Sequence, residues 1–415
     1  MTDTPGTVQL AQGLEATAEF VEEHVQMYKN FHQAPELSSE EHRTAEAIEA
    51  RLEELGIEHF RSGKTGVVGL LVNGEGPVVG FRADTDGLPI EEETGLDYAS
   101  TARGILPDGK EAPTMHGCGH DTHITAALAA AAYLDAHRDA WQGTVVFLFQ
   151  PGEETAYGAK AMVDDGLWDK APRPEVVLAQ HVMPLQAGKF SLRPGNMASL
   201  ADSWKITVRG RQAHGSQPES SLDPIVAAAS MVMRLQTIVS RELSPNTPAV
   251  VTVGTFHAGL KENIIPETAE FSLNVRTPDE DVRAKVLGSI ERIVAAEAQA
   301  SGIGAPGIVE INRFPRLFND AEHTERVTKA LQKGYGEDSV IIAPLGMGSE
   351  DAGWLGDAIG VPVVFWAFGG FAEAAFADGA VPAGNHSPQF APDAELSVIN
   401  GTGAAVSVLM EYLGR

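Results

Sequence analysis

The chain has very little cysteine, relatively few basic residues and no long apolar run. Cys118 is the only cysteine in 415 residues, so no intrachain disulfide can form and a reducing compartment, the cytoplasm, is expected. Against 57 acidic residues there are 30 basic ones, and the net charge of -27 repels phosphates, which excludes a nucleic-acid partner. Residues 1–9 lack a basic segment followed by an apolar core, and no apolar run has the length of a membrane span. Neither export nor a membrane partner is therefore predicted.

The composition is that of a soluble globular protein, with 43% hydrophobic and 21% charged residues. A chain of this length exceeds one ordinary core, which favours two domains. In its first and last parts, continuous apolar runs alternate with helical patterns. This order predicts an α/β fold with a mostly parallel sheet and helices on both faces. Between them, the order β-α-β-β-α-β predicts an inserted ferredoxin-like α+β lid domain. The predicted parts are residues 1–188, 189–307 and 308–415.

The N-terminal region is predicted to form two amphipathic helices. Apolar residues at helical spacing from Leu10 favour a first helix that ends near His32. Ser38 and Glu41 have the spacing of a capping box, in which both side chains bind N–H groups at the start of a helix. A second helix is therefore predicted to begin at Ser38. His32 and Glu36 lie between the two helices and are interpreted as ordinary loop or cap residues.

The segment Met115–Asp121 concentrates groups that bind metals. Thiolate and imidazole both suit zinc-like ions, and the glycines around Cys118 and His120 let the backbone turn both side chains towards one point. By itself, the pair is more typical of a buried structural cysteine beside a hydrogen-bonded histidine than of a metal site. Candidate ligands also occur where other strands or apolar runs end, at Asp84–Asp86, Glu153–Glu154, Gln180–His181 and Asn385–Ser387. In open α/β sheets the carboxyl ends of strands are where sites are built.

These segments supply one thiolate, three imidazoles and a carboxylate, from Cys118, His120, Glu154, His181 and His386. This donor set suits one or two divalent transition ions, which can lower the pKa of a shared water and polarise a carbonyl. Because adjacent glutamates diverge in direction, one of Glu153 and Glu154 can bind metal while the other takes the proton of the water. Two other interpretations stay open. Cys118 could be a nucleophile activated by His120, or the site could bind a metal or ligand without catalysis.

Five segments, in order along nearly the whole chain, resemble the metal-dependent amidohydrolases that include hippurate hydrolase, N-acyl-amino-acid hydrolases and auxin-conjugate hydrolases. These are relatives of aminoacylase and carboxypeptidase G. The segments are Phe81–Pro89, Met115–Asp121, Gln150–Glu154, Gln180–His181 and His386–Pro388. The resemblance implies that the five residues of the donor set are metal ligands and that Glu153 is the general acid/base. It also implies a catalytic domain interrupted by a lid that is often used for dimerisation, so a homo-oligomer is expected.

The same resemblance implies roles for residues in the lid and beside the ligands. His214 is similar to a family histidine that reaches an active site, commonly that of the other subunit, to stabilise the oxyanion. Asn263 and Arg276 are similar to a substrate-binding asparagine and a carboxylate-binding arginine. Asp84 and Asp86 match a ligand and its supporting partner in the wider superfamily, and both are predicted here to support the ligands.

The reaction implied is hydrolysis of the amide bond of a small N-acyl or N-aroyl amino acid to a carboxylic acid and a free amino acid. The alternative is a metallo-carboxypeptidase or dipeptidase on the same scaffold. The metal is expected to be manganese, zinc, cobalt or nickel. Glu219 stands where many members of the family carry another histidine, which leaves the acyl group and the amino acid open.

Overall fold

The computed structural model describes residues 6–415, which divide into two compact units. The first unit comprises the chain up to Met197, Leu317–Pro344 and Asp351–Arg415, and the second comprises Ala198–Arg316 and Leu345–Glu350. Each unit has its own hydrophobic core. A large α/β unit interrupted by a smaller one is the fold class predicted from the sequence, and that prediction is confirmed.

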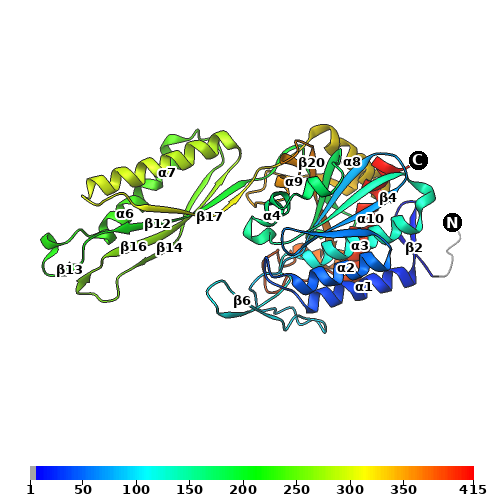
Figure 1. Ribbon diagram of the computed structural model, residues 1–415, viewed down its shortest axis with the longest axis horizontal. Helices are drawn as coiled ribbons and strands as arrows, with labels where there is room; N and C mark the ends of the chain where they lie inside the picture. Colours follow the sequence, from blue (N-terminus) through cyan, green and yellow to red (C-terminus); the bar gives the residue numbers. More distant parts are fainter. Residues whose placement is uncertain (1–5) are drawn as a thin grey trace. The chain divides into compact units, whose positions relative to one another are not determined.

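The first unit is built on a ten-stranded sheet whose central strands run parallel (Figure 1). The order is β11-β18-β20-β9-β5-β8-β4-β3, and off this path β10 pairs with β20 and β19 pairs with β10. β20, β9, β5 and β8 are parallel neighbours, whereas β4 and β3 pair antiparallel at one edge. The strands are β3 (Glu58–Ser62), β4 (Gly66–Asn73), β5 (Val78–Asp84), β8 (Gly143–Gln150), β9 (Val176–Gln186), β10 (Phe190–Leu192), β11 (Gly195–Ala198), β18 (Leu317–Asn319), β19 (Val340–Ile342) and β20 (Val363–Phe371).

Helices cover both faces of this sheet, which is why its central strands are apolar throughout. They are α1 (Ala18–Gln33), α2 (His42–Glu54), α3 (His120–Ala136), α4 (Gly158–Asp164), α5 (Leu167–Lys170), α8 (Ala321–Tyr335), α9 (Gly353–Asp357) and α10 (Ala394–Leu413). Phe81 of β5 packs in the core formed with α3 and α10. The next residue, Arg82, points to the other face, where it pairs with Asp351 near α9. Asp351 also accepts the backbone N–H of Ala159 in α4.

The C-terminal helix α10 is long and apolar enough to cross a membrane, contrary to the prediction that no apolar run has that length. However, 72% of its most apolar window is buried inside the protein. It packs against α1, α3, α8 and β20 of the first unit. Its composition is therefore explained by its place in the core.

The second unit is a four-stranded antiparallel sheet, β14-β16-β12-β17, with α6 and α7 on one face (Figure 1). Its chain order is the predicted β-α-β-β-α-β. Alternate residues of β16 are buried, as expected when helices cover one face only. The elements are β12 (Leu200–Arg209), α6 (Pro224–Leu235), β14 (Val250–Ala258), β16 (Thr268–Thr277), α7 (Glu280–Ala300) and β17 (Gly307–Phe314), with a separate ribbon of β13 (Ala213–His214) and β15 (Ile264–Ile265).

A hairpin occupies the predicted start of the first helix. Its strands are β1 (Thr7–Ala11) and β2 (Leu14–Thr17), and the chain turns at Gly13 with φ of 79°. Thr17 then caps α1, because its Oγ1 accepts the N–H of Phe20 at 3.1 Å. The apolar pattern that begins at Leu10 therefore belongs first to two strands and only then to a helix. A second short hairpin in this unit consists of β6 (Arg103–Ile105) and β7 (Glu111–Pro113).

The second helix begins at His42 rather than at Ser38. Glu36 caps it, because its Oε2 accepts the N–H of Thr44 at 2.8 Å. The predicted capping box of Ser38 and Glu41 is wrong, since Glu41 makes no side-chain cap bond to this helix.

The unit boundaries lie at residues 198 and 316, whereas the sequence placed them at 189 and 307. Strand β10 belongs to the large sheet because it pairs with β19 and β20. Strand β17 belongs to the second unit because it pairs with β12. Strands next to a boundary carry no local sign of the sheet they join.

Candidate metal centre

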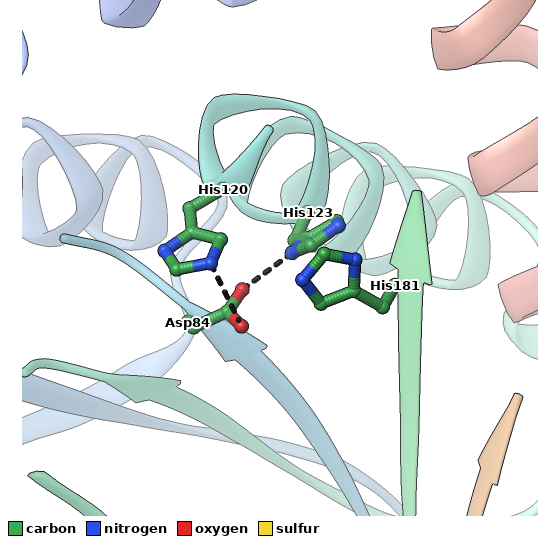
Figure 2. Close-up of side chains that lie close together, drawn as sticks. All are labelled: Asp84, His120, His123 and His181. Atoms are coloured by element: carbon green, nitrogen blue, oxygen red, sulfur yellow. Dashed lines mark hydrogen bonds and ion pairs between the residues drawn. The ribbon is translucent and has the colours of Figure 1, made fainter. Parts of the chain in front are cut away.

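The carboxyl ends of β5, β8 and β9 lie together because these strands are parallel neighbours. Asp84 ends β5, and His181 lies in β9. Glu153 and Glu154 follow β8 in a 3-10 turn, and α3 begins with His120. Figure 2 shows Asp84, His120 and His181 facing one another. The sheet thus brings together groups that are far apart in the sequence.

His120 and His181 direct their Nε2 atoms towards other candidate ligands. Nδ1 of His120 lies 2.9 Å from the carbonyl of Asp86, and Nδ1 of His181 lies 2.8 Å from the carbonyl of Val182. Because a carbonyl only accepts, Nδ1 carries the proton in each neutral ring and Nε2 keeps a lone pair. Among the described residues, the buried Nε2 of His120 has no hydrogen-bond partner, and Nε2 of His181 lies 3.5 Å from Cys118 Sγ. Metal-binding histidines are typically anchored in this way.

Asp84 and His123 adjoin these histidines, but hydrogen bonds already occupy their polar atoms (Figure 2). His123 Nδ1 bonds Asp84 Oδ1, and its Nε2 accepts the N–H of Val182 at 2.7 Å. Oδ2 of Asp84 accepts from Arg82 at 2.7 Å and lies 3.4 Å from His120 Nε2. Burial alone would raise the pKa of Asp84, but the charges of Arg82, His120 and His123 hold it well below its usual value. Asp84 is therefore ionised, and its carboxylate holds His120 and His123 in place.

Cys118, Glu154 and His386 form a second group, whose ligand atoms lie within 4.8 Å of one another. Nε2 of His386 is 3.2 Å from Cys118 Sγ and 3.2 Å from Glu154 Oε1. Oε1 of Glu154 is buried, and apart from this contact with His386 it has no hydrogen-bond partner in the described part of the chain. Asn385 holds the backbone beside this group in place, because its Nδ2 donates to the carbonyls of Cys118 and Val182, each at 3.1 Å.

Negative charge surrounds the thiol of Cys118. Burial raises its pKa well above the usual value, and the carboxylates of Glu154 and Glu153 raise it further. A thiolate therefore requires a nearby cation. The hydrogen-bond partners of the Cys118 thiol are His181, His386 and Asn385 rather than His120, which disfavours a nucleophile activated by His120.

The buried carboxylate of Asp86 supports both the histidines and the glutamates. Its Oδ1 lies 3.2 Å from Nδ1 of His120. The backbone N–H groups of Glu153 and Glu154 donate to its two oxygens, each at 3.1 Å. Ligand atoms of His120, Glu153 and Glu154 lie within 4.8 Å of one another. Although burial lowers the pKa of His120, the negative charges of Asp84 and Asp86 raise it to about 10, so this imidazole attracts a proton or another cation.

The residues present fit a transition metal. The five predicted ligands lie in groups linked by short contacts, and they combine a thiol, imidazoles and a carboxylate. Two of their buried atoms, His120 Nε2 and Glu154 Oε1, lack hydrogen-bond partners among residues 6–415. Such an atom costs roughly 1–3 kcal/mol when nothing binds it. The cluster is therefore a candidate cation site, and the role of each residue as a ligand stays a prediction.

The remaining predicted residues lie in the second unit. His214 and Asn263 are exposed and adjacent, because β13 pairs with β15 and the N–H of Gly215 donates to the carbonyl of Asn263 at 2.8 Å. Nδ1 of His214 accepts the N–H of Ser216 at 3.1 Å, so in the neutral ring Nε2 carries the proton and can donate. The roles of His214 and Asn263 stay predictions.

Arg276 lies at the other end of the second unit's sheet, as the next-to-last residue of β16. Its Nε donates to Asn274 at 2.8 Å and its Nη1 to Ser349 Oγ at 2.6 Å. No carboxylate within residues 6–415 forms an ion pair with it, so its charge is available to a ligand. Its role as the carboxylate-binding residue stays a prediction.

Sequence reasoning overlooked two buried charged groups near the cluster. Arg82 donates to Gln150 at 2.8 Å and to Asp84. Its position directly after an apolar strand segment could have indicated from the sequence that it is buried. The interpretation of His32 as an ordinary loop residue is wrong. It is buried between Asp121 at 2.7 Å and Glu92 at 3.0 Å. No local pattern pointed to that pairing, because Asp121 and Glu92 are distant in sequence.

The sequence is similar to those of known proteins. Residues 80–397 match the model of peptidase family M20/M25/M40. The chain is 39% identical to hippurate hydrolase of Campylobacter jejuni over 78% of its own length and 82% of the relative's. It is 36% identical to N-acetyl-L-cysteine deacetylase of Bacillus subtilis, over 72% of each chain. It is 33% identical to thermostable carboxypeptidase 1 of Saccharolobus solfataricus, over 74% of its own length and 77% of the relative's.

A solved structure extends the similarity to nearly the whole chain. The YXEP protein of Bacillus subtilis, described as a dinuclear metal-binding peptidase of the M20 family, superposes with a TM-score of 0.74 and 28% identity. The match covers 95% of this chain and 99% of that one.

Proposed function

The chain belongs to peptidase family M20/M25/M40, and from this membership we propose that it is a metal-dependent amidohydrolase that cleaves N-acyl or N-aroyl amino acids. The products are a carboxylic acid and a free amino acid. The observation that carries the proposal is the cluster of candidate metal-ligand atoms, two of which lack hydrogen-bond partners in the described chain, with Glu153 beside it. Relatives named for hippurate hydrolysis and N-acetylcysteine deacetylation support the substrate class.

Cys118, His120, Glu154, His181 and His386 would hold the metal, for which manganese, zinc, cobalt and nickel all suit the donors. The dinuclear site of the YXEP protein supports a pair of ions. When bound, the ions would lower the pKa of a water and polarise the carbonyl of the scissile amide. The anchored Nδ1 atoms of His120 and His181 fix each ring so that Nε2 faces the ligand position.

Glu153 would move the proton. Asp86 holds its backbone N–H, and its side chain lies in a group with His120 and Glu154. A carboxylate in that position can take a proton from the attacking water and pass it to the leaving amine. Glu153 and Glu154 thus divide the work, one as the base and the other as a ligand.

Arg276 and His214 would bind the substrate. A guanidinium is a fork of N–H donors that matches a carboxylate, and Arg276 is half-buried with no acidic partner in the described chain. The N–H at Nε2 of His214 can donate to the oxygen that becomes negative when water adds to the amide. Asn263, next to His214, would bind the substrate beside it.

We propose that a second copy of the chain completes this site. Arg276 and Thr268 lie eight residues apart on β16, a span of about 26 Å, and the ribbon that carries His214 and Asn263 lies towards the Thr268 end. One small substrate cannot contact both ends of the sheet within a single second unit. The edge strand β14, with Val250 and Phe256 each 40% exposed, offers a surface for a symmetric contact.

A substrate panel tests the activity. N-benzoyl, N-acetyl and indole-acetyl amino acids are offered to protein loaded with manganese, zinc, cobalt or nickel. Unblocked dipeptides are included, and Glu153→Gln protein prepared in the same way measures contaminating activity. We expect release of the amino acid from N-acyl substrates. If no N-acyl substrate is cleaved with any metal, the proposal is rejected.

The second candidate is a metallo-carboxypeptidase or dipeptidase, favoured by the relative named thermostable carboxypeptidase 1. The same panel separates the two. Faster cleavage of unblocked dipeptides than of every N-acyl amino acid would establish the peptidase instead.

A further inference from the structure

Two carboxylates distant in sequence bind three consecutive backbone N–H groups in the loop after β8. Gly152 N–H donates to Glu41 Oε1 at 2.8 Å. The next two N–H groups, those of Glu153 and Glu154, donate to Asp86 at 3.1 Å each. Both acidic side chains are buried, at 0% and 1% exposure. The backbone of the two glutamates is therefore held by fixed acceptors rather than by water.

Glu41 has no place among the predicted ligands or catalytic groups, yet its whole carboxylate is used. Oε1 also accepts the N–H of Ser39 at 2.7 Å, and Oε2 accepts the hydroxyl of Thr65 at 2.6 Å. The neighbouring Ser38 hydroxyl donates to Asp86 Oδ2 at 2.6 Å. The segment that resembles a capping box in the sequence thus supplies one acceptor for the loop after β8, Glu41, and its Ser38 donates to the other, Asp86.

The two turns that meet here have unusual backbone conformations. Ser39 has φ of 64°, in the left-handed region that a residue with a Cβ seldom adopts. Gly152 has φ of 57°, and a Cβ built there would lie 3.1 Å from Ser39 Oγ. Strained turns persist when surrounding bonds fix them, and here Glu41 Oε1 binds an N–H from each turn.

We infer that Glu41 is a positioning residue, whose Oε1 fixes the Gly152 amide and thereby aims the side chains of Glu153 and Glu154. The expected effect of Glu41 on turnover rests on the proposed function, whereas its role in holding the loop after β8 does not depend on that function. What the loop needs from Glu41 is an acceptor at this point, not a charge. Burial, reinforced by Asp86, raises the pKa of Glu41 to about 7. A protonated carboxyl still offers Oε1 to both N–H groups and can donate to Thr65.

Two substitutions of Glu41 separate the effect of its side-chain length from the effect of its charge. Glu41→Gln keeps the length and the Oε1 acceptor but removes the charge, and the Thr65 hydroxyl can rotate to accept from the new amide. Glu41→Asp keeps the charge but is shorter by one methylene and cannot reach Gly152. Glu40→Asp, at an exposed neighbour that pairs with Lys64, is the matched control.

The first measurement is hydrogen exchange of the peptide spanning residues 150–157 in the full-length protein, which requires no substrate. We expect Glu41→Asp to exchange at least about tenfold faster in this peptide, while Glu41→Gln and Glu40→Asp stay close to the parent. The second is turnover on the best substrate of the panel. Glu41→Asp should lower kcat by about tenfold to a hundredfold with KM within about threefold, because misplaced groups lose alignment rather than binding. Glu41→Gln should retain kcat within about threefold.

Equal losses in Glu41→Gln and Glu41→Asp, or a loss in Glu41→Gln alone, would show that the charge matters and would overturn the inference. Unchanged exchange in Glu41→Asp would overturn it as well, whatever the activity. Faster exchange in Glu41→Asp with normal kcat would show that Glu41 holds the loop but would refute its role in positioning Glu153 and Glu154 for catalysis. If the parent protein cleaves no substrate, the proposed function fails, while the exchange comparison still decides whether Glu41 holds the loop.

Discussion

The two units present their candidate residues in opposite ways. In the first unit, His120, His181 and Asp84 are buried, their ligand atoms lie within 4.8 Å of one another, and partners in the same unit hold each of them. In the second unit, His214 and Asn263 are exposed and have few partners of their own. Buried, mutually bonded groups are preorganised before anything binds, whereas exposed groups act only on something brought to them. The first unit thus carries a preorganised cluster, whereas the candidate residues of the second unit are open to solvent.

The largest expected effect tests the division of work inside the first unit. Glu153→Gln should lower kcat by roughly a hundredfold to ten-thousandfold, because an amide cannot accept the proton of the water. Metal content and thermal stability should stay near those of the parent. Glu154→Gln is the matched comparison and should lose metal first, as measured by elemental analysis. The reverse pattern of metal loss would show that the two carboxylates have exchanged roles.

The second effect tests the exposed residues. His214→Ala should lower kcat by about a hundredfold, as expected for removal of an oxyanion donor, with unchanged metal content and folding. Mixing this variant with Glu153→Gln should restore part of the activity if His214 acts on the site of another copy. An absence of recovery, after subunit exchange has been verified, would place His214 in the site of its own chain.

Arg276 is intermediate between the two kinds of residue, since Asn274 and Ser349 hold it while its charge has no acidic partner among residues 6–415. Arg276→Ala should reduce kcat/KM by about tenfold or more for substrates with a free carboxylate, because charge-assisted bonds are lost. The corresponding amides and methyl esters should be affected much less. Equal losses on acids and esters would remove Arg276 from substrate recognition.

The smallest effect concerns stability of the first unit. Burial lowers the pKa of His32, but its bonds to Asp121 and Glu92 outweigh burial and raise it to about 10. A raised pKa means that this ion pairing stabilises the fold fully below about pH 6.5 and is lost as the pH rises from there to about 10. The stability difference between the parent and His32→Gln should therefore shrink over that range, by at most about 5 kcal/mol.

Denaturant unfolding at a series of pH values measures this difference, and it is compared with that for His42→Gln at an exposed ion pair. A surface pair contributes about 0–1 kcal/mol, so the control should change little at any pH. A His32 difference that grows with pH would show that the imidazole is neutral in the folded protein.

Local patterns were sufficient for most of the architecture. The continuous apolar runs of β5, β8 and β9 identify strands buried on both faces, and the groups that follow them had to meet once those strands were parallel. The β-α-β-β-α-β order of the second unit was likewise readable from alternation and helical spacing. The segment at Leu10 was misread because short paired strands also show apolar residues a few positions apart.

The sequence by itself determined the kinds of donor, their places at the ends of strands and the α/β frame that unites them. Only the tertiary structure decided what each side chain binds. Glu41 has the spacing of a helix cap, yet it accepts an N–H from Gly152, which is 111 residues away. His123 adjoins the cluster, yet Asp84 and Val182 occupy both its nitrogens. A carboxylate or imidazole bonds whichever partner the packed chain brings within reach, and local spacing does not contain that distance.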